Sequence, residues 1–219
     1  MNIKGAIFDM DGTLIDSLGV WEMLWEDMGR EYLGKEGFRP TKADDRTVRT
    51  MTLLDAMTLI HKSYGIAHSG EALCKYASDY IAEFYTSTVQ PKKGVLEFLE
   101  TLFSKGVKMY VASATAPDLV ATAMKHCGIE KYFSGIISCS EIGRGKEHPD
   151  VFLKALEYLG TELEATWVFE DSATALETAR KAGFHTVGIY DKNNYGSDLA
   201  KKASDIYIDD GEDLRIINI

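Results

Sequence analysis

The chain alternates short apolar runs with longer amphipathic stretches over most of its length. The apolar runs lie at residues 5–8, 107–112, 135–138, 166–169 and 186–190. Between them, apolar positions recur with helical spacing at residues 94–103, 118–127, 149–159 and 173–182. Such alternation is typical of βαβ units. The pattern therefore predicts an α/β fold with a doubly wound, parallel five-stranded sheet of the Rossmann-like kind.

One segment breaks this alternation. Residues 17–87 contain no convincing strand pattern, but apolar positions recur with helical spacing at residues 21–25, 51–60 and 72–84. Because the segment follows the first predicted strand, we expect an inserted α-helical domain at 17–87. The α/β core would then comprise residues 1–16 and 88–219.

Composition limits the partners that this chain can bind. Its 24 basic and 34 acidic residues give a net charge of −10, which argues against nucleic acid or an anionic membrane as a general partner. The three cysteines, an odd number without C-x-x-C spacing, indicate reduced thiols. No apolar stretch is long enough for a signal peptide or a membrane span, so we expect a cytoplasmic protein. The oligomeric state stays open.

Polar residues directly follow the predicted strands, and ligands of doubly wound sheets bind at the carboxyl ends of the strands. The first run leads into residues 9–13, the second into 113–115 and the fourth into 170–172, while residues 145–150 lie between the third and fourth runs. One sheet edge would thus collect four carboxylates, one hydroxyl and one lysine. These belong to Asp9, Asp11, Glu170, Asp171, Ser113 and Lys146.

Clustered carboxylates repel one another unless a hard cation neutralises them, and oxygen ligands suit Mg²⁺. A magnesium site explains how an acidic protein holds an anionic group such as phosphate. Ser113 can donate to a phosphoryl oxygen, and Lys146 can supply a positive charge. Gly12 permits close backbone approach, so we expect the amides after Asp9 to face the phosphoryl group. Of the carboxylates Asp9 and Asp11, one can attack phosphorus while the other transfers protons.

These residues carry a resemblance to a known family. The segment Asp9-Met10-Asp11-Gly12-Thr13-Leu14-Ile15-Asp16-Ser17 resembles the first signature of haloacid dehalogenase-superfamily phosphatases. Three further signatures of that superfamily match in chain order, at Ser113, Lys146 and the pair Glu170–Asp171. The helical insert is similar to the small α-helical cap of these enzymes.

The resemblance implies hydrolysis of a small phosphomonoester, a sugar phosphate or nucleotide-like metabolite, through an aspartyl-phosphate. It implies that Asp9 is the nucleophile and Asp11 the general acid and base. It also implies that the Asp9 carboxylate, the Asp11 backbone carbonyl and Asp171 bind Mg²⁺ directly. Glu170 would belong to the metal site at a greater distance from the ion. The phosphoryl group would be bound by Ser113, Ala114 and Lys146.

Sugar phosphomutases of the β-phosphoglucomutase kind resemble the whole chain too, and they stay an alternative. In such mutases a cap histidine stands at the position of Trp21, and this departure favours a phosphatase. A dehalogenase would need neither the second aspartate nor the full Asp171 site. A non-catalytic binding protein would be expected to have lost Asp9 or Asp11.

Two groups of residues in the insert have a structural interpretation. The aromatic side chains at helical spacing are more often core than ligand cage, so we expect packing roles for Trp21, Trp25, Tyr32 and Phe38. On a helix, the basic residues would share one face, but Asp44 and Asp45 would partly offset its positive charge. We therefore expect a solvated face for Arg39, Lys42, Arg46 and Arg49.

Overall fold

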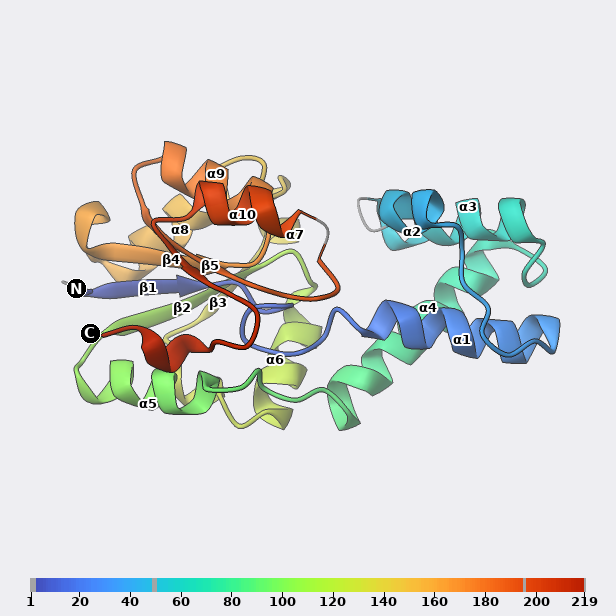
Figure 1. Cartoon of the computed structure of the whole chain (residues 1–219), viewed down its shortest axis with the longest axis horizontal. Coiled ribbons are helices and arrows are strands. Elements are labelled where there is room, and N and C mark those ends of the chain that lie inside the picture. Colours follow the sequence, from blue (N-terminus) through green and yellow to red (C-terminus); the bar gives the residue numbers. More distant parts are fainter. Residues whose placement is uncertain (1–2, 49–50, 195, 219) are drawn as a thin grey trace. The chain divides into compact units, whose positions relative to one another are not determined.

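The computed structural model describes residues 3–48, 51–194 and 196–218. The chain divides into two compact units, and each is described by itself (Figure 1). One unit, here called the sheet unit, consists of Met1–Leu18 with Val89–Ile219. The other, here called the helical unit, consists of Gly19–Thr88.

The sheet unit is built on a parallel sheet with the strand order β3-β2-β1-β4-β5-β6 in its described residues. The strands are β1 (Gly5–Phe8), β2 (Lys108–Ser113), β3 (Ile136–Ser138), β4 (Thr166–Glu170), β5 (His185–Ile189) and β6 (Ile206–Ile208). Strand β1 lies between β2 and β4. Beyond β2 lies β3, and beyond β4 lie β5 and then β6. The α/β prediction is confirmed.

The prediction of five strands missed β6. This strand has only three residues, and it pairs with β5 through Val187 and Ile206, Gly188 and Tyr207, and Ile189 and Ile208. A run of three residues carries too little periodicity to be distinguished from a loop. Its extended conformation comes instead from the neighbouring strand, with which it forms backbone hydrogen bonds.

Helices cover both faces of the sheet. Figure 1 shows α8, α9 and α10 over one face and α5 over the other. The helices of this unit are α5 (Val95–Ser104), α6 (Pro117–His126), α7 (Cys139–Ile142), α8 (Asp150–Leu159), α9 (Ala173–Lys181) and α10 (Ser197–Ala203). Short 3₁₀ turns, labelled η1 to η3, lie at Glu130–Tyr132, Leu163–Ala165 and Leu214–Ile216.

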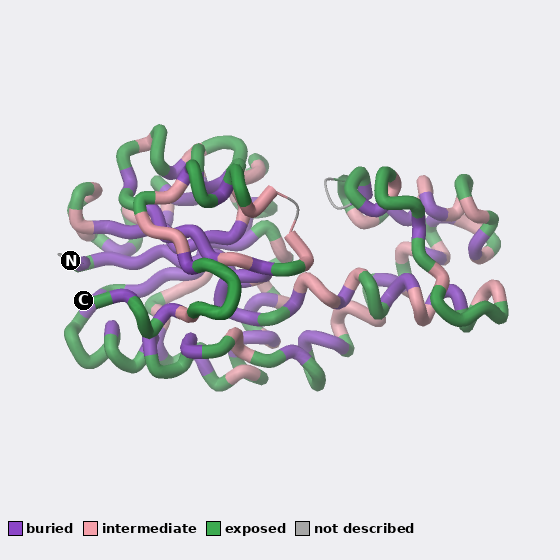
Figure 2. The backbone as a smooth tube through the Cα atoms, viewed as in Figure 1, coloured by how far each residue is buried: buried purple, intermediate pink, exposed green. Residues whose placement is uncertain are grey.

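Strand β1 is buried on both faces, as Figure 2 shows. Successive side chains of a strand point to opposite faces, so Ile7 and Phe8 enter different cores. Ile7 packs in an apolar cluster that α8 and α9 complete with side chains such as Phe152. Phe8 stacks on Phe169 of β4 with ring centroids 4.3 Å apart. The residue after β1 is therefore held by a strand packed from both sides.

The helical unit has its own apolar core and no strand among its described residues. Its helices are α1 (Val20–Leu33), α2 (Lys42–Val48), α3 (Leu53–Tyr64) and α4 (Gly70–Ser87). Thr52 and Ser69 cap the N-termini of α3 and α4 by accepting hydrogen bonds from backbone amides. A Cβ atom at Gly70 would lie 2.5 Å from Thr58 Oγ1, so glycine permits the close approach of these two helices. Within the described part of the chain, none of the helices combines the length and apolar character needed to cross a membrane.

The expected packing role of the aromatic residues is confirmed. Trp25 is fully buried in the core of the helical unit, and Trp21, Tyr32 and Phe38 pack partly buried against that core. The basic residues behave as a solvated surface, since Arg39, Lys42 and Arg46 are exposed. Only the last two of these lie on α2, so the three do not share one helix face. Arg49 lies outside the described residues.

Substituting Trp25 with Phe tests a buried hydrogen bond of the helical unit. The indole Nε1–H of Trp25 donates to Asp45 Oδ1 at 2.7 Å, and both side chains are buried. Removing the donor from a buried carboxylate should cost about 1–3 kcal/mol. Hydrogen exchange of the α1, α3 and α4 amides should show this loss. The control Trp21→Phe removes the same ring volume from a half-buried position and should cost less; an equal loss in both variants would contradict a special contribution of the buried pair of Trp25 and Asp45.

Candidate active site

Asp9 follows β1 directly and is still tied to the sheet. Its backbone N–H donates to the carbonyl of Phe169 on β4 at 2.9 Å, and its side chain is buried. The carboxylate therefore stands at the carboxyl edge of the two central strands, the place predicted for it from the sequence.

The loop after Asp9 is a tight turn closed by its own backbone. The Met10 carbonyl accepts hydrogen bonds from the amides of Thr13, Leu14 and Ile15, and the Gly12 amide donates to Ile15. These four amide hydrogens are thus used inside the loop, so the expectation that the amides after Asp9 face a phosphoryl group is wrong for residues 12–15.

Gly12 is the position in this loop where a side chain could not fit. Its φ of +80° lies in the left-handed region, and a Cβ atom there would lie 2.7 Å from Asp171 Oδ2. The backbone at Gly12 therefore packs directly against the carboxylate at the end of β4.

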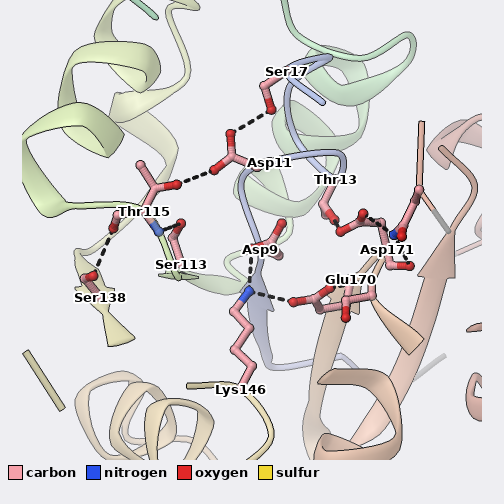
Figure 3. A network of polar contacts seen from close by, with 12 residues as sticks. Asp9, Asp11, Thr13, Ser17, Ser113, Thr115, Ser138, Lys146, Glu170 and Asp171 are labelled. Atoms are coloured by element: carbon pink, nitrogen blue, oxygen red, sulfur yellow. Dashed lines mark hydrogen bonds and ion pairs between the residues drawn. The ribbon is translucent and has the colours of Figure 1, made fainter. Parts of the chain in front are cut away.

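Three carboxylates meet at this edge. Asp9, Glu170 and Asp171 are buried, and one carboxylate oxygen from each lies within 4.8 Å of the others. Lys146, from the segment before α8, forms a short ion pair with Asp9 Oδ1 and donates to Glu170 Oε1 at 2.6 Å (Figure 3). The second Glu170 oxygen accepts from the Ser172 amide at 2.8 Å. Four of the predicted site residues are thus brought together.

The charges in this cluster are not balanced. Burial raises the pKa of the Asp9 carboxyl, and Glu170 and Asp11 raise it further, while the Lys146 ammonium lowers it. Burial raises the pKa of Asp171 well above its usual range, with added repulsion from Glu170 and Asp9. Burial would lower the pKa of Lys146, but Asp9 and Glu170 outweigh this effect and raise it. The raised pKa values of Asp9 and Asp171 reflect the cost of holding three buried carboxylates beside Lys146, the ammonium that contacts Asp9 and Glu170 among the described residues.

This donor set fits a hard divalent cation. Buried carboxylates are costly unless paired or bound to a metal, and the three oxygens are close enough to surround one ion. Both oxygens of Glu170 and both of Asp171 accept hydrogen bonds, whereas Lys146 contacts Oδ1 of Asp9, so the other Asp9 oxygen has the most direct claim on an ion. The Asp11 carboxylate is not part of this group, which is compatible with a ligand role for its backbone carbonyl alone.

Asp11 is held by two hydroxyls instead. Ser17 Oγ donates to its Oδ1 and Thr115 Oγ1 to its Oδ2, both at 2.7 Å. Figure 3 shows its side chain directed away from Asp9 and toward these two residues. Asp11 is only partly buried, so its carboxylate lies at the more open side of the site.

Ser113 ends β2 beside this network. Its Oγ accepts a hydrogen bond from the Thr115 amide at 3.0 Å, which leaves its own hydrogen to be donated elsewhere. The Thr115 carbonyl in turn accepts from Ser138 Oγ of β3 at 2.9 Å. Ala114, next in the chain, is exposed. The loop after β2 is thereby fixed against β3 with Ser113 and Ala114 at its turn.

Sequence reasoning missed some polar contacts of the site. Thr13 Oγ1 lies 3.4 Å from Asp171 Oδ1, and Asn194 Nδ2 donates to Asp171 Oδ2 at 2.6 Å. Asn194 lies just after β5, so examining the polar residues after the fifth apolar run would have pointed to it. Thr115 was visible in the same way, directly after Ser113.

The comparisons with known proteins agree with this geometry. Residues 6–189 match the family described as haloacid dehalogenase-like hydrolase. The chain belongs to this family. The resemblance inferred from the four motifs is therefore confirmed, and so is the expectation of an enzyme in this phosphatase-containing family.

Similar proteins cover nearly the whole chain. It is 26% identical over 216 residues to a phosphorylated carbohydrates phosphatase of Thermotoga maritima, with 98% of each chain covered. It is 26% identical to phosphoglycolate phosphatase 1 of Pseudomonas aeruginosa, covering 95% of this chain and 77% of that one. A solved structure of a provisional β-phosphoglucomutase from Thermotoga maritima matches with a TM-score of 0.80 and 25% identity, with 94% of both chains covered.

Replacing Lys146 with Met should destabilise the metal-free sheet unit. The ammonium is nearly buried between Asp9 and Glu170, so its loss leaves two buried carboxylates without their counter-charge. Breaking such a pair costs about 3–5 kcal/mol. Hydrogen exchange of the β1 and β4 amides in the presence of a chelator measures this cost.

The matched control for this substitution is Lys181→Met. Lys181 pairs with Glu177 at 2.8 Å on the exposed face of α9, where an ion pair contributes less than about 1 kcal/mol. In the control variant, the β1 and β4 amides should exchange hydrogen at the rates of the unaltered protein. A similar small effect for both lysines would contradict the charge imbalance described above.

Proposed function

We propose that this protein hydrolyses a small phosphomonoester with Mg²⁺, using Asp9 as the nucleophile. The observation that carries the proposal is the buried group of Asp9, Glu170 and Asp171 with Lys146 as its ammonium. A carboxylate at the end of a doubly packed strand is well held for attack, and the imbalance of negative charge suits a cation and an anionic substrate together.

In the proposed reaction an Asp9 carboxylate oxygen attacks phosphorus, and the bond from phosphorus to the leaving oxygen breaks. The Asp11 carboxyl gives its proton to that oxygen. Asp11 then takes a proton from water, which attacks the aspartyl-phosphate and releases inorganic phosphate with Asp9 restored. When bound, Mg²⁺ would neutralise the carboxylates and the phosphoryl oxygens.

Lys146 has two roles in this scheme. By contacting Asp9 directly it favours the ionised, nucleophilic form of that carboxylate, and it offsets the charge of the incoming phosphoryl group. Ser113 would donate its hydroxyl hydrogen to a phosphoryl oxygen, and the exposed Ala114 would offer its backbone amide beside it.

Asp11 must turn to act on a leaving group. Its two oxygens accept hydrogen bonds from Ser17 and Thr115, so the structure represents the carboxylate in a resting orientation. A hydrogen bond from a hydroxyl to an ionised carboxylate contributes about 1.5–3 kcal/mol. Rotation of this side chain toward the leaving group therefore requires that contacts with the substrate replace these bonds.

The substrate class follows from the relatives and from the division of the chain. Named relatives act on phosphorylated carbohydrates and phosphoglycolate, which supports a small phosphorylated metabolite. We assign the chemistry to residues 1–16 and 88–219, and substrate selection to the cap at 17–87. Every residue given a chemical role above belongs to the sheet unit, which leaves the helical unit available for specificity.

The first test of the proposal uses p-nitrophenyl phosphate. We expect Mg²⁺-dependent release of p-nitrophenol that a chelator abolishes, and Asp9→Asn should lower kcat by at least about 10³-fold because the nucleophile is lost. The control Asp118→Asn changes an exposed acid on α6 and should keep the activity. Sustained turnover by the Asp9 variant would overturn the assignment of the nucleophile.

The second test separates a phosphatase from a sugar phosphomutase. The position at which the mutases have a cap histidine holds Trp21, whose ring packs against Trp25 with centroids 5.5 Å apart. Because an indole cannot exchange protons as an imidazole does, we expect free phosphate as the product from hexose phosphates. Phosphorus NMR would show it directly, whereas transfer within the hexose phosphate would establish the mutase alternative.

A further inference from the structure

The ammonium of Lys92 connects three segments of the sheet unit. It donates to the Gly12 carbonyl at 2.7 Å, to the Tyr190 carbonyl at 2.9 Å and to Asp191 Oδ2 at 2.9 Å. An ammonium has three hydrogens to donate, and three acceptors surround this one. The Lys92 side chain is 18% exposed and that of Asp191 is 3% exposed, so the ion pair is largely withdrawn from water.

One of these bonds reaches the loop that carries Asp9 and Asp11. Gly12 is the residue whose backbone packs against Asp171 with no room for a Cβ atom. The Gly12 carbonyl belongs to the peptide plane shared with Thr13, which Lys92 holds, and the adjoining plane, which includes the Asp11 carbonyl, is held by the hydrogen bond from the Gly12 amide to the Ile15 carbonyl. Lys92 therefore helps to hold the loop after Asp9 in its orientation beside the acidic cluster, which consists of Asp9, Glu170 and Asp171.

The other bonds reach a turn that holds Asp171. Asp191 Oδ1 accepts the Asn193 amide at 2.8 Å, and the Asp191 carbonyl accepts the Asn194 amide at 3.1 Å. The turn presents the Asn194 side chain, whose Nδ2 donates to the Asp171 carbonyl at 2.9 Å and to Asp171 Oδ2 at 2.6 Å. The Lys92 ammonium is thus hydrogen-bonded both to the loop after Asp9 and to the turn whose Asn194 contacts Asp171.

We propose that Lys92, Asp191 and Asn194 form a positioning brace that sets the spacing of the Gly12 loop and Asp171 for binding of the divalent cation. The inference rests on the proposed function and goes beyond it, because these residues lie outside the four motifs that indicate the chemistry. The bonds run from residue 92 to residues 12, 190 and 191, so the brace exists only in the folded sheet unit.

Substituting Lys92 with Met distinguishes positioning from plain electrostatics. The Lys92 charge acts on Asp171, whose pKa it lowers, so removing that charge would by itself strengthen cation binding. Loss of the brace should weaken cation binding instead, since changing residues that orient metal ligands typically costs about 10–100-fold in metal affinity. The direction of the change therefore identifies the role.

The experiment measures Mg²⁺ binding to the whole chain by calorimetry, with half-saturation of p-nitrophenyl phosphate hydrolysis by Mg²⁺ as a second readout. For Lys92→Met we expect Mg²⁺ affinity to fall by about 10-fold or more, and kcat at saturating Mg²⁺ to change less than the affinity. The matched control is Lys93→Met. Lys93 is the next residue, its side chain is 74% exposed, and it lies 3.6 Å from Asp213, so its loss should leave Mg²⁺ affinity unchanged.

Two further variants keep the test decisive if Lys92→Met folds poorly. Asn194→Ala leaves the ion pair of Lys92 and Asp191 in place and should also weaken Mg²⁺ binding. Lys92→Ala should be partly restored by ethylammonium, because Lys92 lines a cavity of about 320 Å³ whose wall includes exposed residues such as Lys93.

Unchanged or tighter Mg²⁺ binding in both Lys92→Met and Asn194→Ala, with the unaltered protein binding Mg²⁺ normally, would overturn the brace and leave the proposed function intact. Failure of the unaltered protein to bind Mg²⁺ or to release phosphate would overturn the proposed function itself, and the brace with it.

Discussion

Three buried carboxylates facing one ammonium are the constraint on which the rest of this structure depends. Like charges at this separation, withdrawn from water, would destabilise the fold unless something compensates them. Lys146 does so in part by contacting Asp9 and Glu170 together, and Asn194 contributes a neutral donor to Asp171. The remaining negative charge is what makes the site suited to a divalent cation and, through it, to a phosphoryl group.

The sheet makes this arrangement possible. Strand β1 lies between β2 and β4, so the loop after Asp9 is flanked by the loops that carry Ser113 and Asp171. Packing on both faces of β1, with Ile7 in one core and Phe8 in the other, keeps its end from shifting. A rigid strand end lets a carboxylate stay near others that repel it.

Around the acidic cluster, the loops are held by polar contacts, most of which join segments distant in the chain. Thr115 and Ser17 hold Asp11, Ser138 holds the Thr115 backbone, and Lys92 holds Gly12. Gly12 shows why such holding is needed. Its backbone fits against Asp171 so closely that a small displacement of either loop would change the space available to an ion.

Much of the site could be predicted from the sequence because it depends on where apolar runs end. Asp9, Ser113 and Asp171 each follow such a run, and parallel strands bring their carboxyl ends to one edge. Strand β6 could not be predicted, since three residues gain their extended form only by pairing with β5. Lys92 left no local signal either, because the acceptors of its ammonium lie at least 80 positions away in the chain, and Asn194, although it follows a predicted strand, reaches the Asp171 carboxylate only through the fold. The sequence thus determined which chemistry the sheet edge carries, whereas only the tertiary structure decided which side chains hold its loops in place, because a hydrogen bond depends on distances that the chain fold alone sets.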